Sequence, residues 1–410
     1  MKTKLRIAIY HNLPSGGAKR TLYEIVKRLS KKHHIDLYSL SCANNEYCDI
    51  RPFIQNFYIF PFSAIQEFKS PFGRLNYLCR IITLIYLDSL AKKIARLINE
   101  RKYDLAFVQP CQFTQAPLIL RYLKIKTVYH CHEPLRWVYD HKINNNHKVP
   151  KWRKMARDIF DKFDIFRCLY QYMYKKNDFT STRKSTKVIV VSNFIKEKVQ
   201  RIYKIQPELV YNGIDVNKFS LPENIMEKDN YVLSVGALSP VKGFQFIIET
   251  LSLIPLEKRP KLVIVSNTEN LQEQLRLQNL AEKRSVKVII YKKIDDEQLI
   301  KLYQRAKITV YAPVEEPFGL VPLESMSCGT SVIGIREGGV CESVIHQKTG
   351  LLTDRVTENY AKAVQFLLEN KEVARRYDKQ GREYVVENWS WEKSVSNLEK
   401  YFYNVVDDTN

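Results

Sequence analysis

The sequence has little glycine and proline, 13 and 16 residues in a chain of 410. Such low contents exclude collagen-like and low-complexity chains, in which these residues are abundant. Hydrophobic residues make up 45% and charged residues 27%, which is ordinary for a globular protein. No repeat of fixed period is present. The length is more than one compact core usually accommodates, so we expect two domains.

Long hydrophobic runs and metal-type cysteine spacings are also missing. The longest apolar run, near Ile81–Leu87, falls far short of the roughly 18–20 residues that a membrane-spanning helix needs. The eight cysteines contain no C-x-x-C pair, so we expect reduced thiols and no metal site. No secretory signal precedes the first strand-like segment. These absences favour a cytoplasmic protein that is not integral to a membrane.

Acidic residues are scarce in the first half of the chain. Residues 1–205 hold 39 Lys and Arg against 15 Asp and Glu, so 39 − 15 = +24, whereas residues 206–410 hold 26 against 29, so 26 − 29 = −3. This asymmetry indicates an anionic partner for the first half: a membrane surface, a phosphorylated substrate or nucleic acid. A merely solvated basic surface is the alternative. We expect no nucleic acid, because no zinc knuckle, RNP-like or helix-turn-helix pattern is present.

Strand-like and helix-like segments alternate along the chain, as in parallel α/β sheets. The pattern predicts a domain at residues 1–205, a second at 206–389, and a last helix at 390–405 that packs back on the first. Residues 136–180, rich in aromatic and basic residues, interrupt the alternation and are interpreted as a helical insertion. The predicted strands are Leu5–Tyr10, Ile35–Leu40, Leu105–Val108, Thr127–Cys131, Val188–Val191, Tyr231–Gly236, Leu262–Val265, Val286–Ile290, Ile308–Tyr311 and Ser331–Ile333.

The most specific pattern is the stretch from Glu316 to Glu324, with Pro317-Phe318-Gly319 inside it. It follows a predicted strand, and Gly319 is expected to open a helix. Free backbone N–H groups at a helix N-terminus bind anions such as a diphosphate. Two carboxylates beside such a site can accept hydrogen bonds from sugar and ribose hydroxyls. In isolation, the same two glutamates would more often be solvated helix-end carboxylates.

This stretch resembles the E-x7-E motif of the retaining glycosyltransferases of family four, which have the GT-B fold. Other segments match that family's motifs in the same order along the chain: Gly16-Gly17-Ala18, His132-Glu133, Val191-Ser192-Asn193-Phe194, Asn212-Gly213-Ile214-Asp215, Lys242-Gly243, Gly338-Gly339 through Glu342, and Thr349-Gly350-Leu351-Leu352. One position departs from the pattern. In that family an arginine, in the pattern G-R-L, and a lysine bind the diphosphate. Here the pattern is Gly236-Ala237-Leu238, so the arginine is missing and only the lysine, Lys242, remains. Lys292 or Lys293 is a possible replacement for the arginine.

The resemblance implies two doubly wound Rossmann-like domains that face an interdomain cleft, and a nucleoside diphosphate sugar as donor substrate. It implies no metal and no other cofactor. Catalytic roles fall on Glu316, His132 and Lys242, with Glu316 on the sugar hydroxyls and His132 near the reacting carbon. Donor binding falls on the turn and helix residues, with Glu324 on the ribose: Gly16, Gly17, Lys242, Phe318, Gly319, Leu320 and Glu324.

The acceptor is expected to be a lipid-linked sugar or a growing polysaccharide at the inner face of the cell membrane, which the basic first half would contact peripherally. Three alternatives stay open. One is a protein that keeps the fold and the sugar nucleotide but has lost activity, for which Ala237 is the argument. The second is a polyanion-binding protein, and the third is a sugar-nucleotide epimerase of the same fold.

Overall fold

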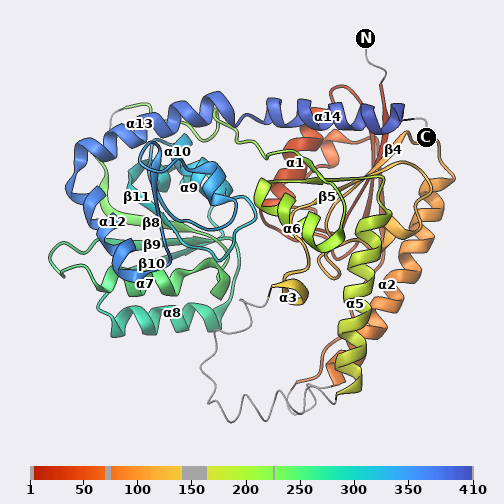
Figure 1. Ribbon diagram of the computed structural model, residues 1–410, viewed down its shortest axis with the longest axis horizontal. Helices are drawn as coiled ribbons and strands as arrows, with labels where there is room; N and C mark the ends of the chain where they lie inside the picture. Colours follow the sequence, from red (N-terminus) through yellow and green to blue (C-terminus); the bar gives the residue numbers. More distant parts are fainter. Residues whose placement is uncertain (1–3, 70–74, 141–163, 225–226, 409–410) are drawn as a thin grey trace. The chain divides into compact units, whose positions relative to one another are not determined.

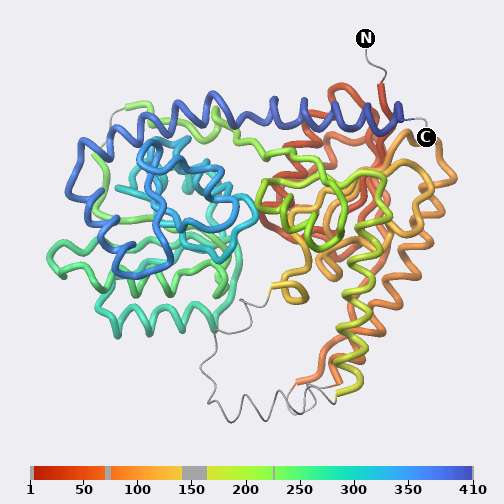
Figure 2. The backbone as a smooth tube through the Cα atoms, in the orientation of Figure 1, coloured from red at the N-terminus to blue at the C-terminus, as the bar shows by residue number. Residues whose placement is uncertain are grey.

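The structure, a computed structural model, describes the chain except residues 1–3, 70–74, 141–163, 225–226 and 409–410. It divides into two compact units, each built around one parallel sheet (Figures 1 and 2). The first unit comprises residues 4–191, 195–210 and 395–408, and the second comprises 192–194 and 211–394. The predicted boundary at 205–206 lies a few residues from the one that the contacts give.

The first unit contains a seven-stranded parallel sheet in the order β3-β2-β1-β4-β5-β6-β7. Its middle strands are buried on both faces, which is why they read as continuous apolar runs. The strands are β1 (Arg6–His11), β2 (His34–Leu40), β3 (Asn56–Phe60), β4 (Leu105–Val108), β5 (Thr127–Cys131), β6 (Lys187–Val190) and β7 (Glu208–Leu209). The helices are α1 (Gly17–Leu29), α2 (Asn76–Asn99), α3 (Arg136–Tyr139), α5 (Ile165–Lys184), α6 (Asn193–Tyr203) and α14 (Trp391–Asp407), with short 3-10 turns at Arg51–Phe53 and Leu118–Arg121.

The last helix belongs mostly to the first unit. Residues from Val395 onward in α14 contact it, and Phe402 is fully buried against Phe107 of β4. The Glu399 carboxylate accepts a hydrogen bond from the Lys32 ammonium at 2.7 Å and lies 3.0 Å from the Nε2 atom of His33. The chain therefore returns at its end to complete the core that its first residues began.

The second unit contains a six-stranded parallel sheet in the order β10-β9-β8-β11-β12-β13. Both this order and that of the first sheet reverse direction at a central pair of strands, as in a doubly wound fold. The strands are β8 (Asp229–Val235), β9 (Lys261–Ser266), β10 (Val288–Lys292), β11 (Ala306–Tyr311), β12 (Val332–Ile335) and β13 (Gly350–Thr353). The helices are α7 (Phe244–Ser252), α8 (Leu271–Lys283), α9 (Asp296–Arg305), α10 (Leu320–Ser327), α11 (Val340–Ser343), α12 (Thr357–Glu369) and α13 (Lys371–Asn388), with a 3-10 turn at Pro240–Lys242.

The ten predicted strands are present, with ends displaced by up to two residues, but three strands were not predicted. These are β3, β7 and β13, and each lies at the end of its sheet. β7 has only two residues, and an edge strand needs little apolar pattern because it pairs on one side only. Two Rossmann-like parallel α/β units are therefore confirmed.

The expected helical insertion is described only in part. Trp152, Phe160 and Phe163 lie outside the described residues. Within the described part, buried Tyr170 of α5 stacks on partly exposed Trp137 of α3, with ring centroids 5.2 Å apart. Phe166, one turn earlier on α5, is exposed.

Candidate functional site

Three loops of the second unit meet at one edge of its sheet. They follow β8, β11 and β12, which are neighbours in the middle of the sheet. The carboxyl ends of parallel strands lie at the same edge, and this edge is where doubly wound sheets bind ligands. The loops carry the lysine, the glutamate and the paired glycines that the sequence pattern singled out.

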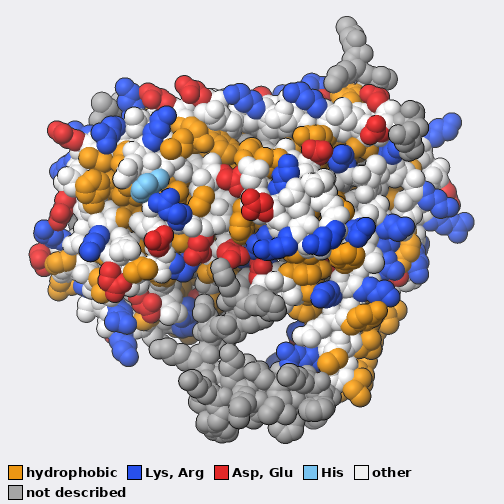
Figure 3. Space-filling view, in the orientation of Figure 1, with side chains coloured by type: hydrophobic (Ala, Val, Ile, Leu, Met, Phe, Trp, Pro, Cys, Tyr) orange, Lys and Arg blue, Asp and Glu red, His pale blue; other side chains and the backbone are white. Residues whose placement is uncertain are grey.

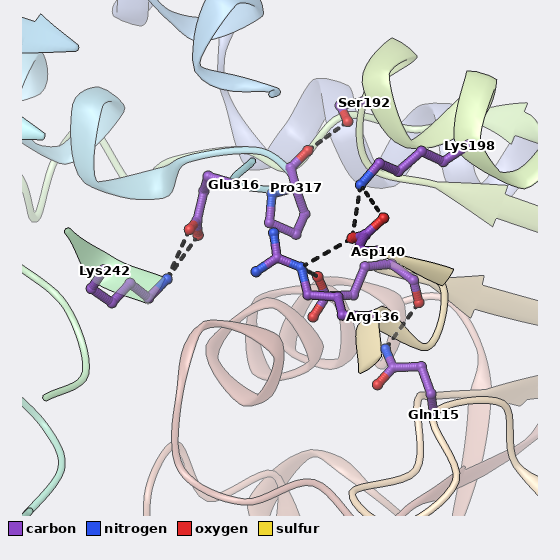
Figure 4. Close-up of polar contacts among 9 residues, drawn as sticks. Gln115, Arg136, Asp140, Ser192, Lys198, Lys242, Glu316 and Pro317 are labelled. Carbon is purple, nitrogen blue, oxygen red and sulfur yellow. Dashed lines mark hydrogen bonds and ion pairs between the residues drawn. The ribbon is translucent and has the colours of Figure 1, made fainter. Parts of the chain in front are cut away.

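Lys242 and Glu316 form an ion pair within this group of loops (Figure 4). The Lys242 ammonium donates to both Glu316 carboxylate oxygens, at 3.1 Å to Oε1 and 2.8 Å to Oε2. The two side chains are 24% and 17% exposed, so a ligand can reach them although they are partly desolvated. Gly236 makes room for the lysine, since a Cβ atom there would lie 3.3 Å from the Lys242 Cγ and Cδ atoms.

The backbone of Glu316 rests directly on Gly338 and Gly339. The Gly339 N–H donates to the Glu316 carbonyl at 2.8 Å. A Cβ atom on Gly338 would lie 2.4 Å from that same carbonyl oxygen, and Gly338 has a φ of 65°, a region that side chains disfavour. The paired glycines are thus required because no side chain fits between the two loops.

Arg355, just after β13, is a supporting residue that the sequence reasoning missed. Its guanidinium pairs with Glu337 at 2.9 Å and donates to the carbonyls of Ala312 at 3.0 Å and Pro313 at 2.7 Å. These contacts hold the start of the loop that ends in Glu316. No signal marked Arg355, because it lies some forty residues further along the chain and outside any motif.

Helix α10 begins directly after the Glu316 loop. Gly319 precedes its first residue with a φ of 94°, a left-handed conformation that glycine tolerates best. The first amides of a helix have no partner within it, so those around Leu320 face the region before the helix. Pro322 has no N–H to offer. Phe318 is buried against Tyr211 and Trp389, with ring centroids 6.1 and 5.4 Å away, and this packing fixes the turn.

Glu324 lies within α10 and is buried, with 5% of the residue exposed. Its Oε2 atom accepts a hydrogen bond from the Tyr303 hydroxyl at 2.9 Å. Burial, together with the nearby Glu324 carboxylate, raises the pKa of Tyr303 well above its usual value. The ribose contact expected of Glu324 stays a prediction, and Tyr303 is one residue that holds this carboxylate in place.

The segment Ser192–Phe194 belongs to the second unit and supports the same loop. The Ser192 hydroxyl donates to the Pro317 carbonyl at 2.5 Å (Figure 4). The Glu342 carboxylate accepts from the amides of Asn193 and Phe194, each at 2.9 Å. Two motifs far apart in the sequence, V-S-x-F and G-G-x-x-E, therefore meet at the loop of a third.

In the first unit, the predicted glycine turn lies between β1 and α1. Gly16 has a φ of 148°, and no atom lies within 4 Å of the position that its Cβ would take. Glycine is thus needed there for the backbone conformation and not for packing against the protein. That open space is where an approaching ligand would be tolerated, but donor binding by Gly16 and Gly17 stays a prediction.

His132 follows β5 at the carboxyl edge of the first unit's sheet. The residue is partly exposed, but its Nε2 atom is buried without a hydrogen-bond partner among the described residues, and burial lowers the pKa of His132 to about 4. His130, two residues earlier, is buried with its ring centroid 4.2 Å from that of His132, and burial, followed by the nearby His132, lowers the pKa of His130 well below its usual value. The next residue, Glu133, is held by Arg136 at 2.9 Å and, through its carbonyl, by Gln115 at 3.0 Å (Figure 4).

Further polar residues gather at this edge and were not predicted. Tyr10, Val108 and Tyr129 are register partners on adjacent strands, so the next positions, His11, Gln109 and His130, follow side by side. Among the described residues, neither amide atom of buried Gln109 and neither ring nitrogen of His130 has a hydrogen-bond partner. Polar side chains at the carboxyl ends of two apolar strands, His11 as the last residue of β1 and Gln109 directly after β4, were the signal that could have found them.

Lys19, in the first turn of α1, is a second unpredicted member of this polar edge. Its ammonium lies 3.4 Å from the His11 Nε2 atom, and the side chain is buried. Burial lowers the pKa of Lys19 to about 8. Burial and then the nearby Lys19 lower the pKa of His11 well below its usual value. This edge is therefore a group of largely buried polar side chains, and His132 is more exposed than His11, Lys19 and His130.

The structure also limits other kinds of site. Within the described ranges, no group of three or more His, Cys, Asp and Glu residues could hold a metal ion. No described helix is both long and apolar enough to cross a bilayer. Lys293, considered as a replacement for the missing arginine, pairs with Glu269 at 3.2 Å beside the edge strand β10, two strands away from β8.

Comparison with known proteins agrees with these motifs. Residues 15–218 match the family model described as Glycosyltransferase Family 4, and residues 215–384 match the model described as Glycosyl transferases group 1. The N-acetyl-alpha-D-glucosaminyl L-malate synthase of Bacillus anthracis is 30% identical over 214 residues, which is 51% of this chain and 55% of that protein. The chain thus spans about half the length of the first curated relatives it matches.

Solved structures show the same fold. The sucrose-phosphate synthase of Thermosynechococcus elongatus superposes with a TM-score of 0.75 at 19% identity, over 99% of this chain and 100% of that one. Alr3699/HepE of Anabaena, in complex with UDP and glucose, superposes with a TM-score of 0.70 at 17% identity, over 98% and 100%. The motifs, the two parallel-sheet units and these matches together show that the chain belongs to glycosyltransferase family 4 and has the GT-B fold.

Proposed function

We propose that the protein is a retaining, metal-independent glycosyltransferase. It moves a hexose-type sugar from a nucleoside diphosphate sugar to a lipid-linked or polysaccharide acceptor at the cytoplasmic face of the membrane. The observation that carries the proposal is the Lys242–Glu316 ion pair beside the first turn of α10. A cation, free amides and a carboxylate at the carboxyl edge of one sheet suit a diphosphate joined to a sugar. A similar structure, HepE, holds UDP and glucose.

The reaction needs negative charge to be stabilised on the departing diphosphate and positive charge on the sugar ring. The amides at the start of α10 are fixed dipoles that serve the first need without rearrangement. Lys242 has three N–H donors and gives two to Glu316, so one is left for a phosphate oxygen. Glu316 is proposed to accept hydrogen bonds from sugar hydroxyls and to stabilise positive charge on the sugar ring.

The acceptor is proposed to bind at the polar edge of the first unit. His132 is uncharged near neutral pH because burial lowers its pKa to about 4, so it acts there as a hydrogen-bonding imidazole and not as a cation. Buried Gln109, which aligns with His130 on the neighbouring strand, has an amide group without a hydrogen-bond partner among the described residues. Placing the acceptor oxygen next to the sugar removes much of the entropic barrier. The leaving diphosphate oxygen takes the acceptor's proton.

The first test compares four proteins in a transfer assay: wild type, Lys242→Ala, Glu316→Ala and Lys258→Ala. Each of the first two variants should lose at least about 100-fold in transfer rate, since each removes a group that acts on the transition-state charges. Lys258 is the matched control because it forms an exposed ion pair of the same length, 2.8 Å, with Glu369 in the same unit. Near-normal transfer by Lys242→Ala or Glu316→Ala would refute the proposed roles.

A donor screen distinguishes activity from binding alone. Thermal unfolding is measured with UDP-, GDP- and ADP-sugars, because a bound donor stabilises the folded protein by mass action. We expect one nucleotide class to raise the melting temperature and to support transfer. A clear thermal shift without any transfer or donor hydrolysis would instead favour the sugar-nucleotide-binding protein that has lost activity, for which Ala237 is the sequence argument.

A further inference from the structure

An exposed apolar surface lies on the paired helices α2 and α5 of the first unit. The two helices pack together through Tyr77 and Tyr170, whose ring centroids are 5.5 Å apart, and Arg80 lies over the Tyr170 ring. Figures 1 and 2 show the helices running side by side away from the sheet, and Figure 3 shows hydrophobic side chains gathered over this part. We call the surface the apolar arm; it consists of Ile82, Ile85, Ile165, Phe166, Leu169 and Tyr172.

The members of the apolar arm are unusually open to solvent. On α2, Ile82 and Ile85 are 44% and 57% exposed, and on α5 Ile165 and Tyr172 are 77% and 61% exposed. On each helix they are spaced by three or four residues, so they form a stripe. This stripe is additional to the one that packs inward, such as Ile81, Leu84 and Leu87 on α2. Single exposed hydrophobic residues are common, but clustered ones mark a surface that another apolar phase covers.

Charge indicates which phase that is. Helix α2 carries four Lys and Arg and one Asp, and α5 carries five Lys and Arg and one Asp, so the pair has 4 + 5 = 9 cations against 1 + 1 = 2 anions. The ammonium of Lys176 lies 5.6 Å from the centre of the Tyr172 ring, at the border of the apolar arm. Apolar side chains flanked by Lys and Arg are typical of helices that lie at the boundary of an anionic bilayer.

A second copy of the chain fits this surface less well. Self-association through α2 and α5 would bring two strongly basic surfaces together, and like charges oppose such contact. An anionic lipid surface satisfies both the charge and the apolar residues. We propose that the apolar arm inserts into the interfacial region of an anionic membrane and thereby holds the enzyme at its acceptor. The purpose of this membrane contact rests on the proposed function. The contact itself rests only on the exposed apolar residues and the basic charge of α2 and α5.

The test is sedimentation with vesicles of phosphatidylcholine, prepared with and without phosphatidylglycerol. The test variant is Ile165→Ser with Leu169→Ser, and a second variant is Ile82→Ser with Ile85→Ser. The control is Leu271→Ser with Leu275→Ser on α8. These two leucines are four residues apart, like Ile165 and Leu169, and are 68% and 50% exposed. Circular dichroism melting of wild type and of all three double variants verifies that each protein folds.

Wild type and the α8 control should bind vesicles that contain phosphatidylglycerol and bind poorly to phosphatidylcholine alone. Each arm variant should lose about tenfold or more in partitioning, since two apolar side chains no longer leave water. Equal binding by the arm variants and the control would overturn the proposal, as would binding that ignores lipid charge. Absence of vesicle binding combined with an arm-dependent dimer in light scattering would assign the surface to a second copy instead.

The donor screen keeps this result separate from the proposed function. A protein that shows no donor-induced thermal shift but binds anionic vesicles through the apolar arm would refute the transferase proposal and leave the membrane contact standing. Conversely, arm variants that keep the donor shift but no longer sediment show that only the docking surface has changed. Soluble acceptor mimics should then be used at an unchanged rate.

Discussion

At the residue scale, the pairing of Lys242 with Glu316 changes how both residues are understood. The sequence pattern assigns Lys242 to the diphosphate and Glu316 to the sugar as separate roles. In the structure each is the other's partner, and both are half-buried. A partly exposed ion pair contributes at most about 1 kcal/mol to stability. The pair is therefore better explained as a means of holding two reactive groups in position than as a stabilising contact.

The histidine at the end of β5 provides a prediction about pH. Burial lowers the pKa of His132 to about 4, whereas an unfolded histidine titrates near about 6.5. The unfolded chain therefore binds this proton first, so His132 contributes stability that is present above about pH 6.5 and is lost as the pH falls toward about 4. We expect His132→Gln to make unfolding stability less dependent on pH across this window, measured by denaturant unfolding at several pH values.

Nuclear magnetic resonance gives a direct check of the same point. The ring signals assigned to His132 by their loss in His132→Gln should not titrate between pH 7.5 and 5.5. A midpoint near about 6.5 for those signals would show an ordinary solvated imidazole. That result would also remove the argument that His132 acts as an uncharged hydrogen-bonding group.

At the scale of elements, the functional loops depend on one another through their backbones. Gly243, with a φ of 73°, lies so close to the Ala312 carbonyl that a Cβ atom would fall 1.9 Å from its oxygen. Val314 donates its amide to the Val241 carbonyl at 2.8 Å. Together with the contact of Gly338 on Glu316, these close backbone contacts connect the loops after β8, β11 and β12 to one another. A change in one loop must therefore displace the next.

This dependence predicts the effect of a single methyl group. Gly338→Ala should lower the free energy of unfolding by at least about 1–2 kcal/mol, the cost of a side chain in a left-handed conformation. It should also lower transfer by about 100-fold, because the Glu316 backbone must move to relieve the clash. Denaturant unfolding and steady-state transfer rates measure the two effects.

The control for that prediction is Gly381→Ala in α13. The three atoms nearest to a Cβ atom there all belong to the Met326 side chain, the closest at 3.1 Å, and a methionine side chain adapts readily. This variant should transfer sugar at close to the wild-type rate. If Gly338→Ala were as active as Gly381→Ala, the idea that the glycine pair positions Glu316 would be wrong.

At the scale of the whole molecule, the chain builds its first unit from both of its ends. Phe402 of α14 is fully buried against Phe107, although nearly three hundred residues separate them. Leu398 is also fully buried, and Glu399 contacts Lys32 and His33. The first unit therefore depends on residues that the chain supplies only after the second unit is complete.

Phe402→Ala should consequently destabilise the first unit by about 3–5 kcal/mol, the usual cost of removing a buried phenylalanine side chain. Lys400→Ala, an exposed position on the same helix, should change stability by less than about 0.5 kcal/mol. Hydrogen exchange resolves where the effect occurs. Amides of β1 and β4 should exchange faster in Phe402→Ala, while those of β8 and β11 should not; faster exchange in the second sheet alone would contradict this assignment.

The sequence alone determined the architecture, because buried parallel strands must read as apolar runs and the helices between them as amphipathic segments. It also fixed the order of the motifs, from Gly16-Gly17 to Gly338-Gly339, and with it the family. Edge strands such as β3 and β7 escaped prediction, since pairing on one side leaves little pattern.

Only the tertiary structure decided which residues act together. Nothing in the spacing of Lys242 and Glu316 shows that their side chains meet, and nothing marks Arg355 or Tyr303 as supports of the site. The apolar residues of α2 and α5 likewise look like core in the sequence, yet several of them face water. The physical reason is the same in each case: hydropathy and local propensity act within an element, whereas ion pairs, backbone contacts and uncovered faces arise only when distant elements pack.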